Sequence, residues 1–257
     1  MITAVAALVR APSPRIAEAE LTHLERTPID VALVARQHAD YLAVLSGLGL
    51  ELVHAPPLPD HADGVFVEDA VVVAGDRAVL TRPGAPSRRG EVDSLAGVLG
   101  DRGLDVHRIR APGTLDGGDV LQVGSAVYVG RTARTDDAGI EQLRALLAPL
   151  GRRVVRVPVT GVLHLKTAVT ALPDGSLVAV PGHVDPTLLA DHDVLWTAEP
   201  AGGDVLVVNG TVLLSAAAPG TAAAVAARGF DVEVVDVSEL EKAEAGVTCL
   251  SVLLPPV

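Results

Sequence analysis

Four segments of the chain share one pattern, and this internal repetition constrains the fold more than any other feature of the sequence. Each segment is an apolar, mostly Val-rich run, a short turn and a second apolar run. The turns are Gly-Asp, Gly-Ser, Asp-Gly and Asn-Gly, and such dipeptides between apolar runs predict β-hairpins. The segments are 70–84, 119–133, 168–182 and 204–220, so they begin in steps of 49, 49 and 36 residues.

A helical stretch and then a lone strand follow each predicted hairpin. The helix after the second hairpin is the clearest, because Ile140, Leu143 and Leu147 recur along one stripe. The third unit is the least regular. In the first unit the predicted helix is 87–100 and the strand 105–112, and in the second they are 136–151 and 153–159. In the third unit they are 185–193 and 193–200, and in the fourth 221–229 and 230–237.

A fifth unit is predicted to be split between the two ends of the chain. Segments 249–257 and 2–12 would pair as its first two strands, with a helix over 30–49 and a closing strand over 50–56. This split closes a ring of units and leaves no free sheet edge. An ordinary two-domain α/β protein is the alternative. We favour the ring, and we expect a single α/β domain over residues 1–257.

Composition and charge narrow the class of protein. A hydrophobic content of 49% excludes a disordered chain, and a net charge of −12 disfavours a nucleic-acid partner. The single cysteine excludes an intrachain disulfide and a Cys-based zinc cluster, and it favours a reducing compartment. No stretch approaches the ~20 apolar residues of a membrane span, and no basic segment precedes the first apolar run. We therefore expect a cytoplasmic protein without a membrane partner; a homodimer is left open.

Polar residues stand where each predicted unit begins. They are Glu68 and Asp69, Asp116 and Asp119, His164 and Lys166, Asp204, and Cys249. Equivalent positions of a closed ring converge on its axis. The sequence therefore predicts a central pocket that holds carboxylates, an imidazole and a thiol.

This set of groups suits covalent catalysis. A cysteine thiolate is a nucleophile, a histidine moves protons, and a third group orients the histidine. A cationic substrate could itself stabilise the thiolate. Taken singly, a lone Cys is more often an inert buried residue, and His164 between two leucines suits a core position. No serine nucleophile elbow or phosphate loop occurs, and segment 183–193 is only a weak metal candidate.

Six motifs together resemble the dimethylarginine dimethylaminohydrolase family over nearly the whole chain. The motifs are FVEDAVVV, TRPGAPSRRGE, PGTLDGGDV, VGRTARTDDAG, VLHLKTAVTALPDG and GVTCLSV. The resemblance implies a five-bladed α/β-propeller, the pentein fold, which agrees with the repeat count. It also implies hydrolysis of a small-molecule methylated arginine to citrulline and a methylamine, with no metal or organic cofactor.

The same resemblance implies the roles of individual residues. Cys249 would be the nucleophile, His164 the proton donor and later the general base, and Asp116 the residue that orients His164. Substrate-binding roles fall on carboxylates for the guanidino and amino groups, arginines for the α-carboxylate, and two main-chain carbonyls. The carboxylates are Asp63, Glu68 and Asp69, and the arginines are Arg88 and Arg134. The main-chain carbonyls are those of Leu21 and Ala243.

Two alternative functions stay open. An arginine deiminase would use the same chemistry, but that family usually carries an inserted helical domain for which this chain has no room. A noncatalytic propeller of the eukaryotic translation initiation factor six family would share the ring. Such a binding module would not require Cys249, His164 and Asp116 together with two arginines.

Overall fold

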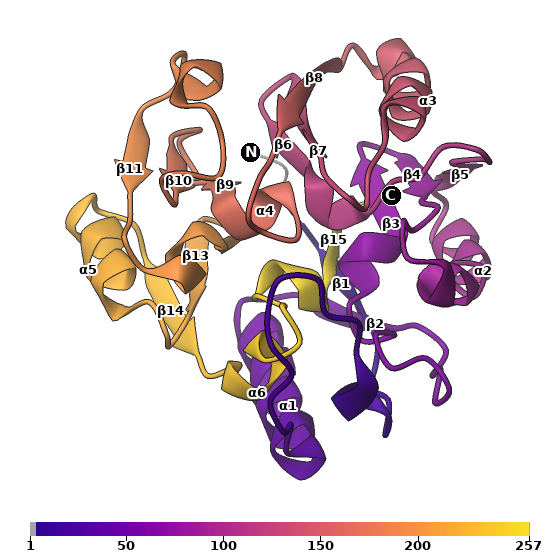
Figure 1. Ribbon diagram of the computed structural model, residues 1–257, viewed down its shortest axis with the longest axis horizontal. Coiled ribbons are helices and arrows are strands. Elements are labelled where there is room, and N and C mark those ends of the chain that lie inside the picture. The colour runs from indigo at the N-terminus through magenta and orange to yellow at the C-terminus, as the bar shows by residue number, and fades with distance from the viewer. Residues whose placement is uncertain (1–3, 257) are drawn as a thin grey trace.

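The computed structural model describes residues 4–256 and forms five small sheets arranged in a ring around one axis (Figure 1). Each sheet has three strands. In every sheet the middle strand pairs antiparallel with the first strand and parallel with the third. The predicted five-bladed α/β-propeller is therefore confirmed.

Four blades are continuous in sequence, and each predicted hairpin forms the first two strands of one blade. The first blade holds β3 (Val71–Ala74), β4 (Arg77–Leu80), α2 (Leu95–Asp101) and β5 (Asp105–Arg108). The second holds β6 (Val120–Val123), β7 (Ala126–Arg131), α3 (Asp137–Leu147) and β8 (Arg153–Pro158). The third holds β9 (Val169–Ala171), β10 (Leu177–Ala179), the 3-10 helix η6 (Pro186–Leu189) and β11 (Val194–Trp196). The fourth holds β12 (Leu206–Val208), β13 (Thr211–Ser215), α5 (Pro219–Ala227) and β14 (Val232–Val235).

The fifth blade is assembled from both ends of the chain, as predicted. It holds β15 (Val252–Leu254), β1 (Ala6–Val9), α1 (Val31–Gly47) and β2 (Glu51–His54). Leu254 lies opposite Ala6 in the antiparallel pair, and Ala6 lies opposite Glu51 in the parallel pair. The predicted strand segments also included residues 2, 3 and 257, which lie outside the described residues.

Two predicted helices were wrong in detail. Segment 87–100 is not one helix, because η3 (Pro86–Glu91) ends before α2 begins. The carbonyl of Glu91 accepts hydrogen bonds from Ser94 Oγ and Arg10 Nη2 in place of the backbone N–H that a continuous helix would supply. In the third blade, 185–193 forms only η6, which Asp185 caps by accepting from the backbone N–H of Thr187.

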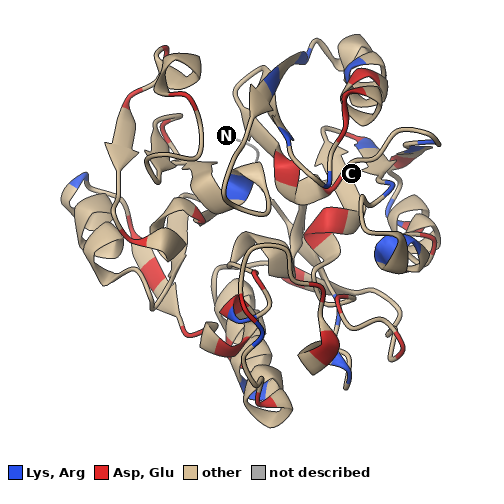
Figure 2. Cartoon of the chain, in the orientation of Figure 1, with Lys and Arg blue, Asp and Glu red and all other residues tan. Residues whose placement is uncertain are grey.

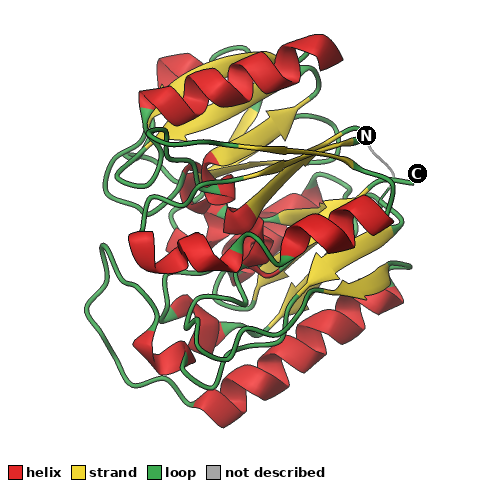
Figure 3. Cartoon of the chain, turned by 90° about the vertical axis from the view of Figure 1, so that its right-hand side faces the viewer, coloured by secondary structure: helices red, strands yellow, loops and turns green. Residues whose placement is uncertain are grey.

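The apolar core lies between neighbouring blades. Between the fifth and first blades, for example, Leu95 and Leu99 of α2 pack with Leu8 of β1 and Leu80 of β4. The longer helices therefore cover the outside of the ring, and the strands lie inside it (Figure 3). Among the described residues, no helix combines the length and the apolar character that crossing a membrane requires.

A single helical turn precedes the first strand of every blade. These turns are η2 (Val67–Ala70), η4 (Gly117–Asp119), α4 (Leu165–Ala168), η7 (Pro200–Gly203) and η8 (Thr248–Leu250). Around the axis, η8 contacts η2, η2 contacts η4, η4 contacts α4, and α4 contacts η7. Acidic residues lie on segments around this centre as well as on the outer helices (Figure 2). The turns thus carry the polar residues of the blade starts to the middle of the ring.

Candidate active site

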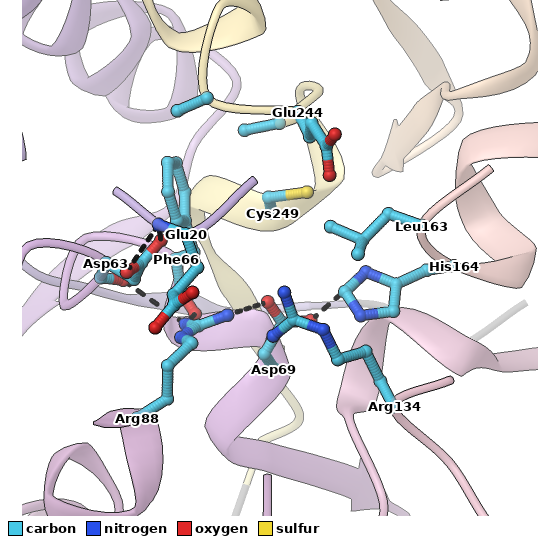
Figure 4. A pocket seen from close by; sticks show the side chains of 12 residues that line it. Glu20, Asp63, Phe66, Asp69, Arg88, Arg134, Leu163, His164, Glu244 and Cys249 are labelled. Atoms are coloured by element: carbon cyan, nitrogen blue, oxygen red, sulfur yellow. Dashed lines mark hydrogen bonds and ion pairs between the residues drawn. The ribbon is translucent and has the colours of Figure 1, made fainter. Parts of the chain in front are cut away.

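The axial turns and the loops above them enclose one small pocket, and the close view shows the side chains that face it (Figure 4). The predicted site residues Asp63, Asp69, Arg88, Arg134, His164, Ala243 and Cys249 line it. The other lining residues are Glu20, Phe66, Leu163, Glu244 and Ala245.

Three predicted site residues are not among the residues that line this pocket. Asp116 lies behind the imidazole of His164, and Glu68 lies in η2 beneath the pocket. Leu21 does not line the pocket, whereas its neighbour Glu20 does.

The imidazole of His164 lies between two carboxylates. Its Nε2 is 3.1 Å from Oδ2 of Asp116, and its Nδ1 is 3.7 Å from Oδ1 of Asp69. Burial alone would lower the pKa of this imidazole, but the carboxylates outweigh burial and raise the pKa to about 9. His164 is therefore an imidazolium at neutral pH. Gly118 permits this packing, since a Cβ there would lie 2.5 Å from Nδ1.

The thiol of Cys249 is buried beside the same pocket, and its Sγ accepts a hydrogen bond from the backbone N–H of Gly246 at 3.4 Å. Burial, followed by the negative charges of Asp204, Glu68 and Asp69, raises the pKa of this thiol well above its usual value. The free protein at neutral pH thus holds a neutral thiol and a cationic imidazole. A cation bound in the pocket would stabilise the thiolate.

Arg88 is held almost entirely by the protein. Its Nη1 donates to Asp69 Oδ2 at 2.6 Å and its Nη2 donates to Glu91 Oε2 at 2.9 Å. Its Nη2 also donates to the carbonyls of Asp63 and Phe66, and its Nε donates to Glu91. A guanidinium has five N–H donors. One N–H of Nη1 has no acceptor among the described residues, so Arg88 can offer a ligand its charge and about one hydrogen bond.

Arg134 is the freer of the two predicted arginines. Its Nη2 donates to Oγ1 of Thr22 at 3.0 Å, and its Nη1 lies 4.0 Å from Oδ2 of Asp116. Its guanidinium reaches toward the centre of the pocket in Figure 4. The nearby Asp63 accepts from the backbone N–H of Glu20 at 3.2 Å, and burial raises the pKa of its carboxyl to about 6.

The loop 20–24 closes the pocket from outside. The carboxylate of Glu244 accepts hydrogen bonds from the backbone N–H groups of Thr22, His23 and Leu24, at 3.0, 2.5 and 2.5 Å. The cavity that remains is about 10 Å³, which is room for about one water molecule. A larger ligand can bind only when residues around this cavity move.

Glu68 and Lys166 form an ion pair below the pocket. Glu68 also accepts a hydrogen bond from Oγ1 of Thr248 at 2.9 Å. Burial raises the pKa of Glu68, and the ammonium of Lys166 opposes this effect. Both residues line a second cavity of about 620 Å³ that the inner strands surround. The ion pair therefore lies between the pocket and this cavity.

Asp69, Asp116 and His164 are close enough to one another to ligate a metal ion. Their contacts are already explained by charge pairing, because the two carboxylates flank an imidazolium. Asp69 also binds Arg88, and Oδ1 of Asp116 accepts from the backbone N–H of Gly84 at 2.9 Å. We therefore assign these residues no metal.

Sequence reasoning missed Glu244, Thr22 and Glu91 as residues of the site. Glu91 carried a signal, since it stands three residues after Arg88 and so can pair with it within one turn. Glu244 and Thr22 carried none, because they meet only when the two ends of the chain fold together.

A five-bladed ring that presents a thiol and a carboxylate-bound imidazolium at its axis defines a class: the guanidino-group modifying enzymes of the pentein fold.

The comparisons with known proteins narrow this class. No protein-family model matches the chain. Dimethylarginine dimethylaminohydrolase from Streptomyces coelicolor is 47% identical over 254 residues, which is 96% of either chain. The enzyme of that name from Pseudomonas aeruginosa is 35% identical over 226 residues, covering 86% of this chain and 89% of its own. The chain belongs to the dimethylarginine dimethylaminohydrolase family.

Solved structures agree with this assignment. A cysteine-to-serine mutant of the Pseudomonas aeruginosa enzyme in complex with citrulline superposes with a TM-score of 0.93 at 32% identity, over 98% of this chain and 100% of the other. A dimethylarginine dimethylaminohydrolase adduct with S-methyl-L-thiocitrulline gives the same TM-score and identity, over 99% and 100%. An amidinotransferase from Microseira wollei, at 16% identity and a TM-score of 0.83 over 99% and 95%, shares the fold.

Proposed function

We propose that the protein hydrolyses Nω,Nω-dimethyl-L-arginine and Nω-methyl-L-arginine to L-citrulline and the corresponding methylamine. The relatives bear the name of this activity, and one structural neighbour holds citrulline. The observation that carries the proposal is the pairing of Cys249 with His164 across one pocket, in charge states that suit a cationic substrate.

The charges around the pocket suggest how the substrate would bind. Arg134, with the remaining N–H of Arg88, would hold the α-carboxylate, because guanidinium groups match carboxylates in geometry and charge. Asp63 would bind the amino group. Asp69 would bind the guanidinium in the pocket, and Glu68 beneath the pocket would add negative charge; the charges of both act on the Cys249 thiol. The main-chain carbonyls of Leu21 and Ala243 would complete the pocket around the bound substrate.

The first half of the reaction would form a covalent intermediate. The guanidinium is a cation that stabilises the thiolate, so binding would favour loss of the Cys249 proton to solvent. The Sγ–C bond forms at the guanidinium carbon, which becomes tetrahedral and neutral. His164 then transfers its proton to the dimethylamino nitrogen as the C–N bond breaks. Dimethylamine leaves, and a cationic amidino thioether remains on Cys249.

The second half would regenerate the enzyme. His164, now neutral, takes a proton from water as the water oxygen attacks the thioether carbon. The C–S bond breaks, the thiolate departs, and the new hydroxyl loses its proton to give the urea group of citrulline. His164 is again an imidazolium, and Asp116 beside it keeps the ring oriented throughout. Asp69 and Glu68 provide negative charge that is in place before the reaction begins.

The test is product analysis with a Cys249→Ser variant. We expect equimolar citrulline and dimethylamine from dimethylarginine, and no turnover by the variant, since a hydroxyl is far harder to deprotonate than a thiol. Cys249 is the only cysteine of the chain, so an adduct trapped during turnover must map to its peptide. A variant that makes citrulline at the native rate would end the proposal.

The same assay separates the alternative functions. An arginine deiminase would release ammonia from arginine faster than it releases dimethylamine from dimethylarginine. A noncatalytic propeller would turn over no guanidine. We further propose that the enzyme acts in the cytoplasm, because a single catalytic thiol must stay reduced.

A further inference from the structure

Carboxylates near the axis hold the backbone of the next blade along the ring. Asp119 of the second blade accepts at Oδ1 from the N–H of Leu165, at 2.9 Å. Asp204 of the fourth blade accepts at Oδ1 from the N–H of Thr248, at 3.0 Å. Leu165 directly follows His164, and Thr248 directly precedes Cys249. In both blades the bonded N–H therefore belongs to a neighbour of a residue that would react.

Asp204 makes more contacts to the Cys249 turn than this one bond. Its Oδ2 lies 3.2 Å from Oγ1 of Thr248, whose hydroxyl also bonds Glu68. Its carboxylate packs directly on Gly246, where a Cβ would lie 2.3 Å from Oδ2. Gly246 is the residue whose N–H contacts the sulfur of Cys249. Asp204 is thus buried against both sides of the turn that presents the thiol.

The protonation of Asp204 fits this arrangement. Burial, together with the charge of Glu68, raises the pKa of its carboxyl to about 7. A protonated Oδ2 can donate to Oγ1 of Thr248, which can then donate to Glu68, while Oδ1 still accepts the N–H of Thr248. An Asn side chain can reproduce this pattern, because its amide has one acceptor and one donor group.

We propose that Asp204 is a positioning residue that sets the orientation of the Cys249 thiol. Its bond to the backbone beside Cys249 is of the same kind as the bond of Asp119 to the backbone beside His164. The proposal rests on the proposed function, in which the thiol attacks a guanidinium carbon. Asp204 does not line the pocket and would touch no substrate. Asp204 acts through the backbone of η8, which carries Cys249. Turnover slows when a nucleophile is misplaced, even if substrate binding is intact.

The experiment compares Asp204→Ala, Asp204→Asn and a matched control, Asp185→Ala. Asp185 makes the same pair of bonds, accepting from the N–H and the hydroxyl of Thr187 at 2.9 and 2.8 Å, but on the exposed side of the third blade. We expect Asp204→Ala to lower kcat by roughly 10- to 100-fold with little change in KM. Asp204→Asn should recover most of this loss, and Asp185→Ala should match the wild type.

A second readout does not depend on turnover. The rate at which iodoacetamide alkylates Cys249 in the free protein is measured against pH for each variant. Besides Asp204, the charged groups around this thiol are Glu68 and Asp69 of η2, with Lys166 paired to Glu68, and the charged residues that line the same pocket. These residues are Glu20, Asp63, Arg88, Arg134, His164 and Glu244. Asp204→Asn removes a negative charge while keeping the bonds, so its alkylation profile should move to lower pH.

A folded Asp204→Ala protein with kcat within about twofold of the wild type would overturn the proposal, and so would a kcat loss in Asp185→Ala as large as in Asp204→Ala. If Asp204→Ala does not fold, Thr248→Val decides by the same kcat comparison, since it removes the hydroxyl that joins Asp204 to Glu68. Unchanged kcat in that variant, with an unchanged alkylation profile in Asp204→Asn, would also overturn it. Failure of the wild type to turn over any guanidine would refute the proposed function instead. The alkylation rate of Cys249 in Asp204→Ala, compared with the rates in Asp204→Asn and Asp185→Ala, would still decide the positioning role.

Discussion

Asp116→Asn removes one carboxylate charge beside His164 and keeps the shape of the side chain. The wild-type Oδ1 accepts the N–H of Gly84 at 2.9 Å, and Oδ2 lies 3.1 Å from Nε2 of His164. The amide oxygen of Asn can take the place of Oδ1, which leaves the NH₂ group against Nε2. Because an NH₂ group only donates, it favours an unprotonated Nε2 and opposes the imidazolium.

The size of the effect follows from the pKa of His164. Burial disfavours the imidazolium, yet Asp69, Asp116 and Asp119 together raise the pKa from 6.5 to about 9. That difference corresponds to roughly 3 kcal/mol in favour of the charged ring, at about 1.4 kcal/mol per pKa unit. Losing the share of Asp116 should lower the pKa by about 1 unit or more. Turnover at neutral pH should fall by about 10²- to 10⁴-fold, as expected when an orienting carboxylate is lost.

The same pKa predicts how stability depends on pH. A raised folded-state pKa stabilises the protein fully below the unfolded value of 6.5, and this contribution is lost as the pH rises toward about 9. In Asp116→Asn, the part of the unfolding free energy that is lost between pH 6.5 and 9 should therefore be smaller. Urea unfolding at the two pH values measures this difference directly.

Citrulline formation between pH 6 and 9 and NMR titration of the His164 ring complete the assay. Asp136→Asn is the control, because Asp136 also accepts backbone N–H groups, from Thr114 at 3.0 Å and Gly139 at 2.7 Å, but does not line the pocket. A His164 pKa that stays near 9 in Asp116→Asn, or a kcat within about twofold of the wild type, would refute this reasoning.

Three further outcomes are expected. Because the free enzyme holds a neutral Cys249 thiol and a protonated His164, kcat/KM should rise about tenfold per pH unit from pH 7 to 8 and level off near pH 9. A flat kcat/KM profile between pH 7 and 8 would contradict the assigned charge states. Arg134→Lys keeps the charge but loses the planar guanidinium with its paired N–H donors, so KM for dimethylarginine should rise by roughly 10- to 100-fold. A substrate lacking the α-carboxylate should be turned over equally by the wild type and the variant. Tyr41→Phe removes a buried hydroxyl that bonds the carbonyl of Val247 at 2.9 Å and Oγ of Ser251 at 2.8 Å, so urea unfolding should show that the free energy of unfolding falls by about 1–3 kcal/mol. An unchanged free energy of unfolding would show that these hydrogen bonds make no net contribution to stability.

Local pattern was enough to predict the blades. Paired apolar runs around Gly-Asp, Gly-Ser, Asp-Gly and Asn-Gly specify hairpins through neighbouring residues alone, and all four hairpins form. The spacing of the repeats predicted the ring, and closure of the ring predicted the strand pairing between the two ends of the chain. The position of Cys249, His164 and Asp69 at blade starts likewise predicted that they would converge.

Only the tertiary structure decided what each polar side chain does there. The sequence marks Arg88 and Glu68 as charged groups, but the fold commits most donors of Arg88 to the protein and pairs Glu68 with Lys166. It also joins Glu244 to Thr22 across 222 positions of the chain. Burial and neighbouring charge set the pKa values of Cys249 and His164. Hydrogen-bond partners, solvent exclusion and electric field are properties of the space around a side chain, and residues distant in sequence fill that space.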